Sequence, residues 1–450
     1  MRNVVLVTID SLRADHVGCY GYDRPTTPEI DEMAEDGLSF DAYANSHWTR
    51  ASFPSIITST YPLEYGGFEY LSDERTTVGT AVGAAGHATA AFHSNLWLSR
   101  DYNYDRGFDH FYDSKSDPSL LARARAWLKL NLDHDGLVYR TLQRLYDTTE
   151  EKAGVDVGQT YKDAETITDE AIDWLDGVEE PFFCWIHYMD VHHPYVPHDA
   201  AADALGLDLD VSEREAIKLR RKMLEEPGDL TDEEFRTLVD LYDTEIRYTD
   251  AEIGRLRDHV RSSFDGETAF LVTADHGEEF GEHGGYSHNA GMYDEVMHVP
   301  LVVTDPGDVT PGSQADLVEL LDVAPTCCDL AGAPVPDEYR GRSVLSAAGS
   351  GEDAEVICET WRDEEYKLAL RTREWKFIWN RESGERELYD LADDPGETED
   401  LAESEDAIAG EMEERLREHL QELAATNEEL PDVSMDAETE QRLRDLGYLE

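Results

Sequence analysis

Acidic and imidazole side chains stand where two apolar runs of the sequence end. Asp10 follows the apolar run Asn3–Ile9. Asp275 and His276 follow the run Ala269–Thr273. In open α/β sheets ligands collect at the carboxyl ends of strands, so two such strands could hold one cation between them. Asp10 could simply cap a turn, and His276 could be an ordinary loop histidine. Such roles would explain either segment alone, but they explain the two segments together less well.

The segments that must position these side chains alternate strand and helix signals. Over residues 1–115, apolar strands are separated by helix starts such as Pro28 at a first helical position. This βαβ pattern predicts a mostly parallel sheet flanked by helices. A further buried strand at 181–186 leads to Asp190 and His192.

Two long segments, 118–180 and 205–263, have the pattern of helical insertions with polar faces. Thr231 to Glu234 is a capping box, and apolar residues follow it at spacings of three and four. That stripe is typical of core packing rather than of a cofactor surface. After Pro336 a Gly- and Ser-rich stretch separates the sheet from a strand-and-turn region that ends in a Glu-rich helix.

The composition restricts the partners. The 450 residues include 100 Asp and Glu against 38 Lys and Arg, for a formal net charge of −62. Such a surface repels nucleic acid and anionic membranes, and it is typical of a protein from a very salty cytoplasm. At ~1 M salt the Debye length is only ~3 Å, so an anionic ester would respond to the local site and remains compatible with the acidity.

The compartment is expected to be the cytoplasm. The first strand has no basic-then-apolar leader before it, and no apolar stretch is long enough to span a membrane, so we expect no stable membrane insertion. Cysteines are odd in number and lack paired metal-site spacing, which suits a reducing interior and small core positions. The oligomeric state is not indicated. The cysteines are Cys19, Cys184, Cys327, Cys328 and Cys358.

Six segments, in family order, resemble the sulfatase family of the alkaline phosphatase superfamily. The resemblance implies an α/β fold with a central, mostly parallel sheet flanked by helices. It also implies a smaller C-terminal domain with an antiparallel sheet, so we expect a catalytic domain over 1–345 and the smaller one over 352–450. The segments are 3–21, 48–62, 188–195, 273–284 (Thr-Ala-Asp-His-Gly-Glu-Glu-Phe-Gly-Glu-His-Gly), 293–303 and 387–395.

In this family the nucleophile opens a helix, nine residues before a Thr-Gly pair. Counting back from Thr58 gives Thr49, where a helix N-terminus would favour a bound oxyanion. A second register takes Ser52 as the serine form of the Cys/Ser-x-Pro-x-Arg signature, although it lies three residues too close. The signature's arginine position holds Phe53 or Ile56, depending on the register. An N-cap role for Thr49 is the structural alternative.

The residue type at this position affects the expected substrate. Sulfatases of the family oxidise a cysteine, or in some cases a serine, to formylglycine, whose second hydroxyl expels sulfate. Threonine has no such hydroxyl, so an ester on Thr49 must be cleaved by water. The resemblance to the superfamily's threonine-type phosphatases and phosphotransferases therefore favours a phosphate ester, with a true sulfatase as the alternative.

The resemblance implies one metal site, formed by Asp10, Thr49, Asp275 and His276. Many family members carry Asp-Asp where this chain has Asp10-Ser11, and Asn where it has His276. Fewer oxygens and one imidazole favour Mn²⁺, Zn²⁺ or Mg²⁺ over Ca²⁺. The ion would lower the pKa of the threonine hydroxyl and neutralise charge on the transferred group.

Histidines supply the expected proton transfer. His192 matches a family histidine that contacts the ester and can protonate the leaving group, and His288 falls where the family has Lys or His. His193 is expected to be a hydrogen-bonded loop histidine. Asn95 and Arg13 are further candidates for contacts with the substrate.

Two other functions stay open at this point. In a two-metal phosphodiesterase or phosphotransferase, Asp190, His192 and His288 would hold a second ion. A degenerate family member would be a binding protein, although the retention of all four presumed ligands argues against it. The expected substrate is a sulfate or phosphate ester of a small molecule, glycan or lipid.

Overall fold

A mixed sheet of eight strands forms the centre of the protein, in the order β10-β2-β9-β6-β1-β5-β3-β4. The computed structural model describes residues 1–114, 161–288, 291–304, 311–347, 354–362 and 365–426. The strands are β1 (Asn3–Ile9), β2 (Leu38–Tyr43), β3 (Ala88–Phe92), β4 (His110–Tyr112), β5 (Phe182–Tyr188), β6 (Thr268–Ala274), β9 (His298–Val303) and β10 (Gly312–Glu319).

The sheet is parallel except for β9, which runs antiparallel to both of its neighbours, β2 and β6. Every residue of β1 and β5 is buried, as expected for parallel strands with both faces covered by helices. The prediction of a mostly parallel sheet is confirmed.

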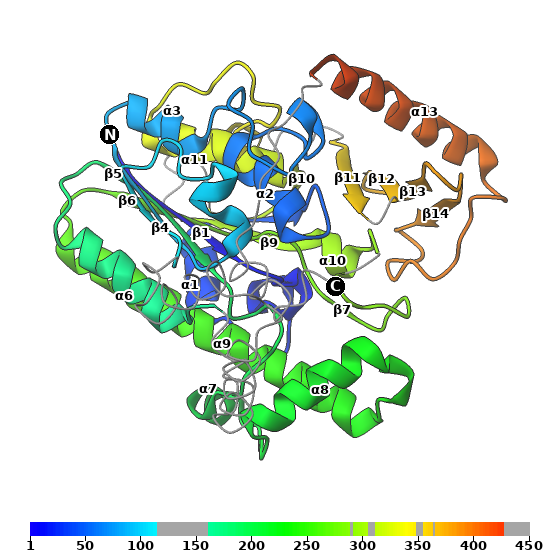
Figure 1. The fold of residues 1–450 in the computed structure, drawn as a ribbon, viewed down its shortest axis with the longest axis horizontal. Helices are drawn as coiled ribbons and strands as arrows, with labels where there is room; N and C mark the ends of the chain where they lie inside the picture. Colours follow the sequence, from blue (N-terminus) through cyan, green and yellow to red (C-terminus); the bar gives the residue numbers. More distant parts are fainter. Residues whose placement is uncertain (115–160, 289–290, 305–310, 348–353, 363–364, 427–450) are drawn as a thin grey trace, which may run out of the picture.

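Helices cover both faces of this sheet (Figure 1). One face carries α1 (Pro28–Asp36), α6 (Ala164–Leu175) and the long α9 (Asp232–Ser263). The other carries α2 (Thr49–Thr58), α3 (Val78–Ala84) and α11 (Val323–Ala331). Helix α9 begins with the predicted capping box, in which Thr231 and Glu234 bond each other's backbone N–H groups.

The expected helical insertions are described only in part. Residues 118–160 of the first lie outside the described residues, and α6 forms part of its remainder. Helices α7 (Asp199–Leu205), α8 (Glu213–Glu225) and α9 follow β5. Shorter elements near the sheet are β7 (Glu279–Phe280), β8 (Tyr286–Ser287), α10 (Asp294–Met297) and α12 (Val344–Ala347).

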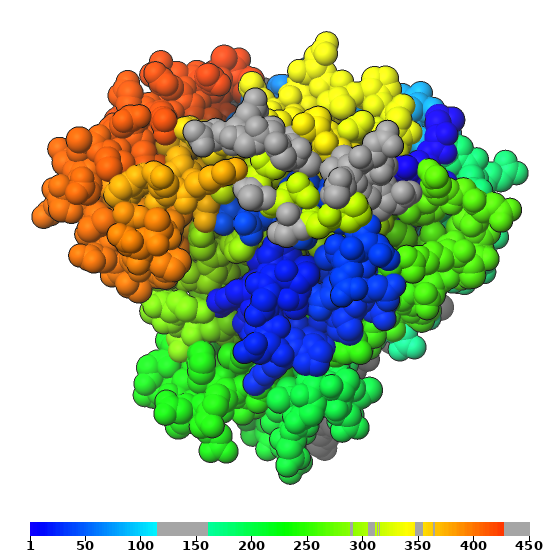
Figure 2. Space-filling view, turned by 180° about the vertical axis from the view of Figure 1, so that it is seen from behind, coloured from blue at the N-terminus to red at the C-terminus, as the bar shows by residue number. Residues whose placement is uncertain are grey.

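The C-terminal part is a second, four-stranded antiparallel sheet in the order β11-β12-β13-β14. Helix α13 (Asp406–Leu423) covers it, and their contact has its own apolar core. Figure 2 shows from behind that this part, orange to red, forms one corner of the molecule. The antiparallel sheet is confirmed, whereas the domain boundary between 345 and 352 stays a prediction. The strands are β11 (Val356–Arg362), β12 (Glu365–Arg371), β13 (Trp375–Asn380) and β14 (Arg386–Asp390).

A buried ion cluster fastens this corner to the main body. Lys376 of β13 is 1% exposed, and its Nζ lies 2.8 Å from Asp294 Oδ1 and 2.8 Å from Glu397 Oε1. Arg371 adds a second cation, 3.0 Å from Asp294 Oδ2. Burial alone would raise the pKa of Asp294, but Lys376 and Arg371 hold it well below its ordinary value. Asp294 is therefore charged at neutral pH, whereas burial raises the pKa of Glu397.

Lys376→Met is expected to lower the free energy of unfolding by about 3–5 kcal/mol, because the buried Glu397 loses its cation and the partly exposed Asp294 keeps only Arg371. Denaturant unfolding measures this, with Lys218→Met on the exposed face of α8 as the control. Because the folded pKa of Asp294 is depressed, its contribution is present above about pH 4 and is lost as the pH falls further. Equal stability of the two variants would contradict this role.

Among the described helices, none combines the length and the apolar character needed to cross a membrane. The five cysteines are free thiols, and all except the half-buried Cys19 are fully inside the core.

Candidate active site

The site begins where three central strands end side by side. Strand β1 is parallel to β5 and β6, and Ile9 pairs with Tyr188 on one side and Ala274 on the other. Asp10 and Asp275 are the next residues, so the sheet delivers both carboxylates to the same edge. Both are completely buried.

Ser11 holds these two carboxylates in place. Its backbone N–H donates to Asp275 Oδ1 at 3.2 Å, and its hydroxyl donates to Asp10 Oδ1 at 2.8 Å. The φ of Ser11 is 58°, in the left-handed region that few side chains adopt. Such backbone strain clusters at functional sites, where the surroundings fix it. The serine thus orients both carboxylates of the site.

Thr49 is the first residue of α2, and its side chain points at the strand ends. Its Oγ1 donates to Asp10 Oδ2 at 3.2 Å and lies 3.3 Å from His276 Nε2. The helix N-cap is Trp48, and the structure gives no side-chain cap bond there. The interpretation of Thr49 as an N-cap is therefore wrong, and its hydroxyl belongs to the cluster.

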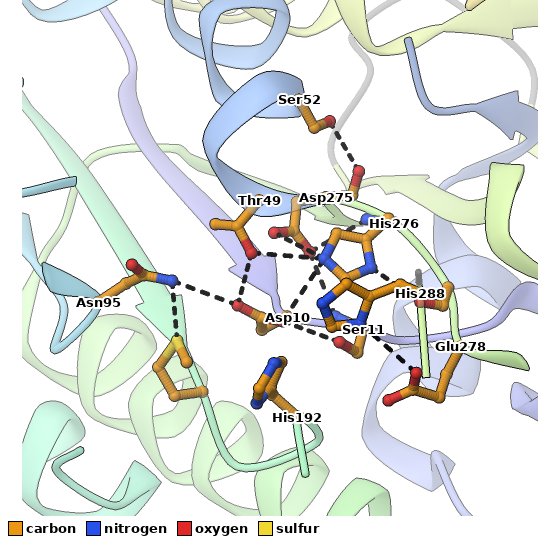
Figure 3. Close-up of polar contacts among 12 residues, drawn as sticks. Asp10, Ser11, Thr49, Ser52, Asn95, His192, Asp275, His276, Glu278 and His288 are labelled. Atoms are coloured by element: carbon orange, nitrogen blue, oxygen red, sulfur yellow. Dashed lines mark hydrogen bonds and ion pairs between the residues drawn. The ribbon is translucent and has the colours of Figure 1, made fainter. Parts of the chain in front are cut away.

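Ser52 lies one turn further along α2 and is engaged elsewhere. Its hydroxyl donates to the main-chain oxygen of Asp275 at 2.7 Å. Figure 3 shows Thr49, Asp10 and His276 gathered around one point, with Ser52 outside that group. The geometry favours the register with Thr49.

The donor atoms fit a divalent cation. His276 Nδ1 lies 2.8 Å from Gly277 O, so Nδ1 carries the proton and Nε2 keeps its lone pair. That Nε2 lies 3.7 Å from Asp10 Oδ1 and 3.6 Å from Asp275 Oδ2. Asp275 Oδ2 is buried and accepts no hydrogen bond from the described residues. Ligand atoms of Asp10, Asp275 and His276 all lie within 4.8 Å of one another.

The electrostatics of the two carboxylates also suit a cation. Burial and the nearby Asp10 charge raise the pKa of Asp275 well above its ordinary value. Burial would do the same to Asp10, but His192, His187 and His276 lower its pKa below the ordinary range. Two buried carboxylates this close cannot both be charged without compensation, which a bound metal ion would supply.

His192 and His288 border this cluster. Their ring centroids are 5.3 Å apart, and the ring of His288 lies 4.6 Å from that of His276. His192 Nδ1 donates to His193 O at 2.6 Å, which leaves the lone pair on Nε2. Burial lowers the pKa of His192 to about 4, so its ring is neutral in the ligand-free protein.

The set of ligands considered for a second ion does not assemble. Asp190 Oδ1 accepts the N–H of Ala164 at 2.9 Å, and Asp190 belongs to neither group of potential metal ligands among the described residues. The second such group instead joins His193 to His192 and His288.

His193 cannot complete that group, because both of its ring nitrogens are engaged. Its Nδ1 accepts from Arg220 Nε at 3.1 Å, so its protonated Nε2 donates to Ser287 Oγ at 2.9 Å. No lone pair is left for an ion, and a guanidinium stands beside the ring. The loop role predicted for His193 agrees with this geometry.

The two further candidates differ. Asn95 Nδ2 lies 3.4 Å from Asp10 Oδ2, so its amide stands at the edge of the cluster. Arg13 instead binds Asp15 at 2.7 Å and Glu282 at 2.5 Å, and donates to the main chain of Glu278. With its guanidinium committed to two carboxylates, Arg13 loses support as an anion contact.

Two site residues were missed from the sequence. His187 lies in the otherwise apolar β5, and its Nε2 is 3.5 Å from Asp10 Oδ2. Glu278 accepts from Tyr195 Oη at 3.0 Å and lies 3.5 Å from His288 Nδ1, so it orients that ring. Burial raises the pKa of Glu278 to about 7. His187 could have been found from the sequence, because it is a polar residue inside a buried strand.

Comparison with known families gives the identification. The Sulfatase family profile matches residues 2–333. The chain belongs to the sulfatase family. A second profile, N-sulphoglucosamine sulphohydrolase, C-terminal, matches residues 281–426. As a member, the protein is an ester hydrolase, and enzymes of this family generally bind a divalent metal.

Individual relatives are distant but cover at least 90% of the chain. An arylsulfatase of Clostridium perfringens is 24% identical over 90% of this chain and 91% of its own. A phosphonate monoester hydrolase of Agrobacterium radiobacter has a TM-score of 0.68 at 19% identity, covering 94% and 96% of the two chains. A protein solved with its substrate D-glucosamine-2-N,6-O-disulfate has a TM-score of 0.70 at 18% identity, covering 94% and 98%. These structures share the alkaline phosphatase/sulfatase-like fold.

Proposed function

We propose that this sulfatase-family hydrolase cleaves phosphate esters through a covalent ester on Thr49. The observation that carries the proposal is the threonine hydroxyl itself, 3.2 Å from Asp10 Oδ2 and 3.3 Å from His276 Nε2 at the start of α2. Threonine cannot become the aldehyde hydrate from which family sulfatases expel sulfate. Water must release the transferred group, which favours phosphoryl over sulfuryl.

Different residues of the site carry out different parts of the reaction. A divalent ion held by Asp10, Asp275 and His276 would lower the pKa of the Thr49 hydroxyl and neutralise charge on the ester. The free N–H groups of the first turn of α2 stabilise the ester's terminal oxygens. The Thr49 hydroxyl first loses its proton to water. Its Oγ then attacks phosphorus, the bond to the leaving oxygen breaks, and that oxygen takes a proton.

His192 or His288 supplies the proton. In the ligand-free protein the Nε2 of His192 carries a lone pair, and a bound dianionic ester would raise the pKa of this ring by its charge. The second step reverses the roles: the imidazole accepts a proton from water as the water attacks phosphorus and Thr49 leaves. Glu278 and the His193 carbonyl orient the two rings.

We propose a single Mn²⁺, Zn²⁺ or Mg²⁺ rather than Ca²⁺, because the donor set combines two carboxylates and one imidazole nitrogen. Both ring nitrogens of His193 are already hydrogen-bonded, and Asp190 binds a backbone N–H instead of joining the ligand group. Both observations argue against a second ion. Elemental analysis of the purified protein should find about one ion per chain for this small donor set, and two would support the phosphodiesterase alternative.

The substrate is proposed to be a phosphate ester of a small molecule, glycan or lipid, in a salty cytoplasm. Turnover of 4-nitrophenyl phosphate, 4-nitrophenyl phenylphosphonate and 4-nitrophenyl sulfate should be compared in molar KCl with each metal. The phosphate or phosphonate ester is expected to exceed the sulfate in kcat/KM by at least about tenfold, or ~1.4 kcal/mol in the barrier. A faster sulfate ester would restore the true sulfatase, and no turnover of any ester would favour the non-enzymatic alternative.

His276→Ala is expected to weaken metal binding by about 10- to 100-fold without abolishing it, because both charged ligands remain. Titration of the metal-stripped protein measures this. His193→Ala is the matched control, since it removes an imidazole from the same region but no proposed ligand. An unchanged affinity in His276→Ala would remove that residue from the site.

A further inference from the structure

Strand β11 of the C-terminal sheet runs along the loop that leads into α2, the helix that begins at the proposed nucleophile Thr49. Asn45 Nδ2 donates to Ile357 O at 2.9 Å, and the N–H of Glu359 donates to Asn45 O at 2.8 Å. Further along, Trp48 Nε1 donates to Thr360 Oγ1 at 3.3 Å. The end of β11 therefore arrives beside the residue that precedes the proposed nucleophile.

Arg362 is the last residue of β11 and brings a positive charge to this point. Its guanidinium carbon lies 5.1 Å from the centroid of the Trp48 ring. Trp48 is the residue between His47 and Thr49, so Arg362 lies against the segment that carries both side chains.

His47 directly precedes Trp48, and the polar atoms of its ring have no partner in the described part of the chain. It is 3% exposed, and neither ring nitrogen has a hydrogen-bond partner among the described residues. The neighbouring Ser46 Oγ is also buried without a hydrogen-bond partner among the described residues. Buried polar atoms without partners are costly and rare, so they indicate a ligand or water that these groups bind.

Helix α2 itself places no guanidinium beside the proposed nucleophile. Phe53 and Ile56 occupy the signature's arginine position in the two registers. Arg50 turns away, with its Cζ 4.1 Å from the Trp97 ring centroid and its Nη2 donating to Glu69 O at 2.9 Å. A cation for the substrate has to come from another part of the chain.

The position of Arg362 points to the leaving group rather than to the transferred group. The adjacent Trp361 is 59% exposed and, with Tyr366 and Phe68, lines a groove of about 530 Å³. Phe68 packs edge-to-face on Trp48, with ring centroids 5.4 Å apart. The aromatic side chains of this groove suit an organic leaving group. Because Glu69 and Glu382 also line it, a negative charge on that group is better placed at Arg362, over the Trp48 ring.

We infer that Arg362 and His47 form a subsite for a second anionic substituent, such as a carboxylate, sulfate or phosphate, on the alcohol portion of the substrate. This inference rests on the proposed ester hydrolysis at Thr49. The guanidinium pairs with the anion, and the imidazole donates one hydrogen bond to it.

Two esters that share a chromophore test the subsite. One is 4-nitrophenyl phosphate, and the other carries an additional carboxylate on the same ring. Arg362→Gln is expected to lower kcat/KM for the carboxylated ester by about 10- to 100-fold and for the plain ester by less than about threefold. Arg362→Lys should retain part of the discrimination. Arg373→Gln, at the far end of the same sheet, is the control.

An equal loss on both esters, or no loss on either, would overturn the inference. The carboxylated nitrophenol product gives a separate readout by calorimetry on the full chain. It should bind the wild type about tenfold or more tightly than Arg362→Gln, and equal affinities would contradict the subsite. If this difference appeared while neither ester was turned over, the proposed phosphate hydrolysis would fail and the subsite would stand.

Discussion

Asp275→Ala and Asp10→Ala are each expected to remove bound metal and turnover together. Each variant deletes a charged ligand from a small donor set, so metal affinity should fall by more than about 100-fold. Asp275 Oδ2 is the more telling atom, because it is buried and accepts no hydrogen bond within the described structure. Elemental analysis after gel filtration and a turnover assay measure the two losses.

Asp190→Asn is the matched control for these variants. It also neutralises a buried carboxylate near the site, but Asp190 accepts a backbone N–H from Ala164 and belongs to neither ligand group among the described residues. Metal content should stay at the wild-type value. Full metal content in both Asp10→Ala and Asp275→Ala would refute the site, and a loss in Asp190→Asn would revive the second ion.

Much of the site could be predicted because it depends on strand ends. Asp10 and Asp275 each follow an apolar run, and parallel neighbours must end at the same edge of a sheet. Thr49 was found by spacing alone, and the hydrogen bond of Ser52 to the main chain now gives a physical reason to prefer it. The capping box at Thr231 was equally local and was also found.

Other features depend on contacts between distant segments, which one sequence does not show. His187 is an ordinary strand residue until β5 is placed beside β1. Arg13 was a reasonable anion contact until Glu282, far along the chain, was found to bind it. The left-handed φ of Ser11 and the approach of Arg362 to Trp48 likewise result from tertiary packing.

The antiparallel course of β9 between β2 and β6 was not predicted either. Its apolar run from His298 to Val303 resembles that of a parallel strand, because both kinds are buried here. The chain passes through β7, β8 and α10 before β9 returns antiparallel to β6, and composition alone does not reveal this direction. The smaller sheet was easier to predict from the sequence, since its strands alternate in polarity and its turns are short.

Thr49→Ala is expected to reduce turnover by more than about 10³-fold, the cost of removing a nucleophile whose ligands and donors remain. Metal content should fall much less than in Asp275→Ala, since both carboxylates and His276 are kept. Ser52→Ala is the control, and it should retain most activity because its hydroxyl bonds only a main-chain oxygen. Loss of activity in Ser52→Ala alone would show that the register was chosen wrongly.

The covalent intermediate tests the central claim most directly. Enzyme mixed with an activated aryl phosphate, quenched in acid and digested should carry an adduct of about 80 Da, one added phosphoryl group. Our account predicts this adduct on Thr49, sensitive to phosphatase and absent from Thr49→Ala. An adduct on Ser52, or rapid sulfate ester turnover through an unmodified Thr49, would contradict it.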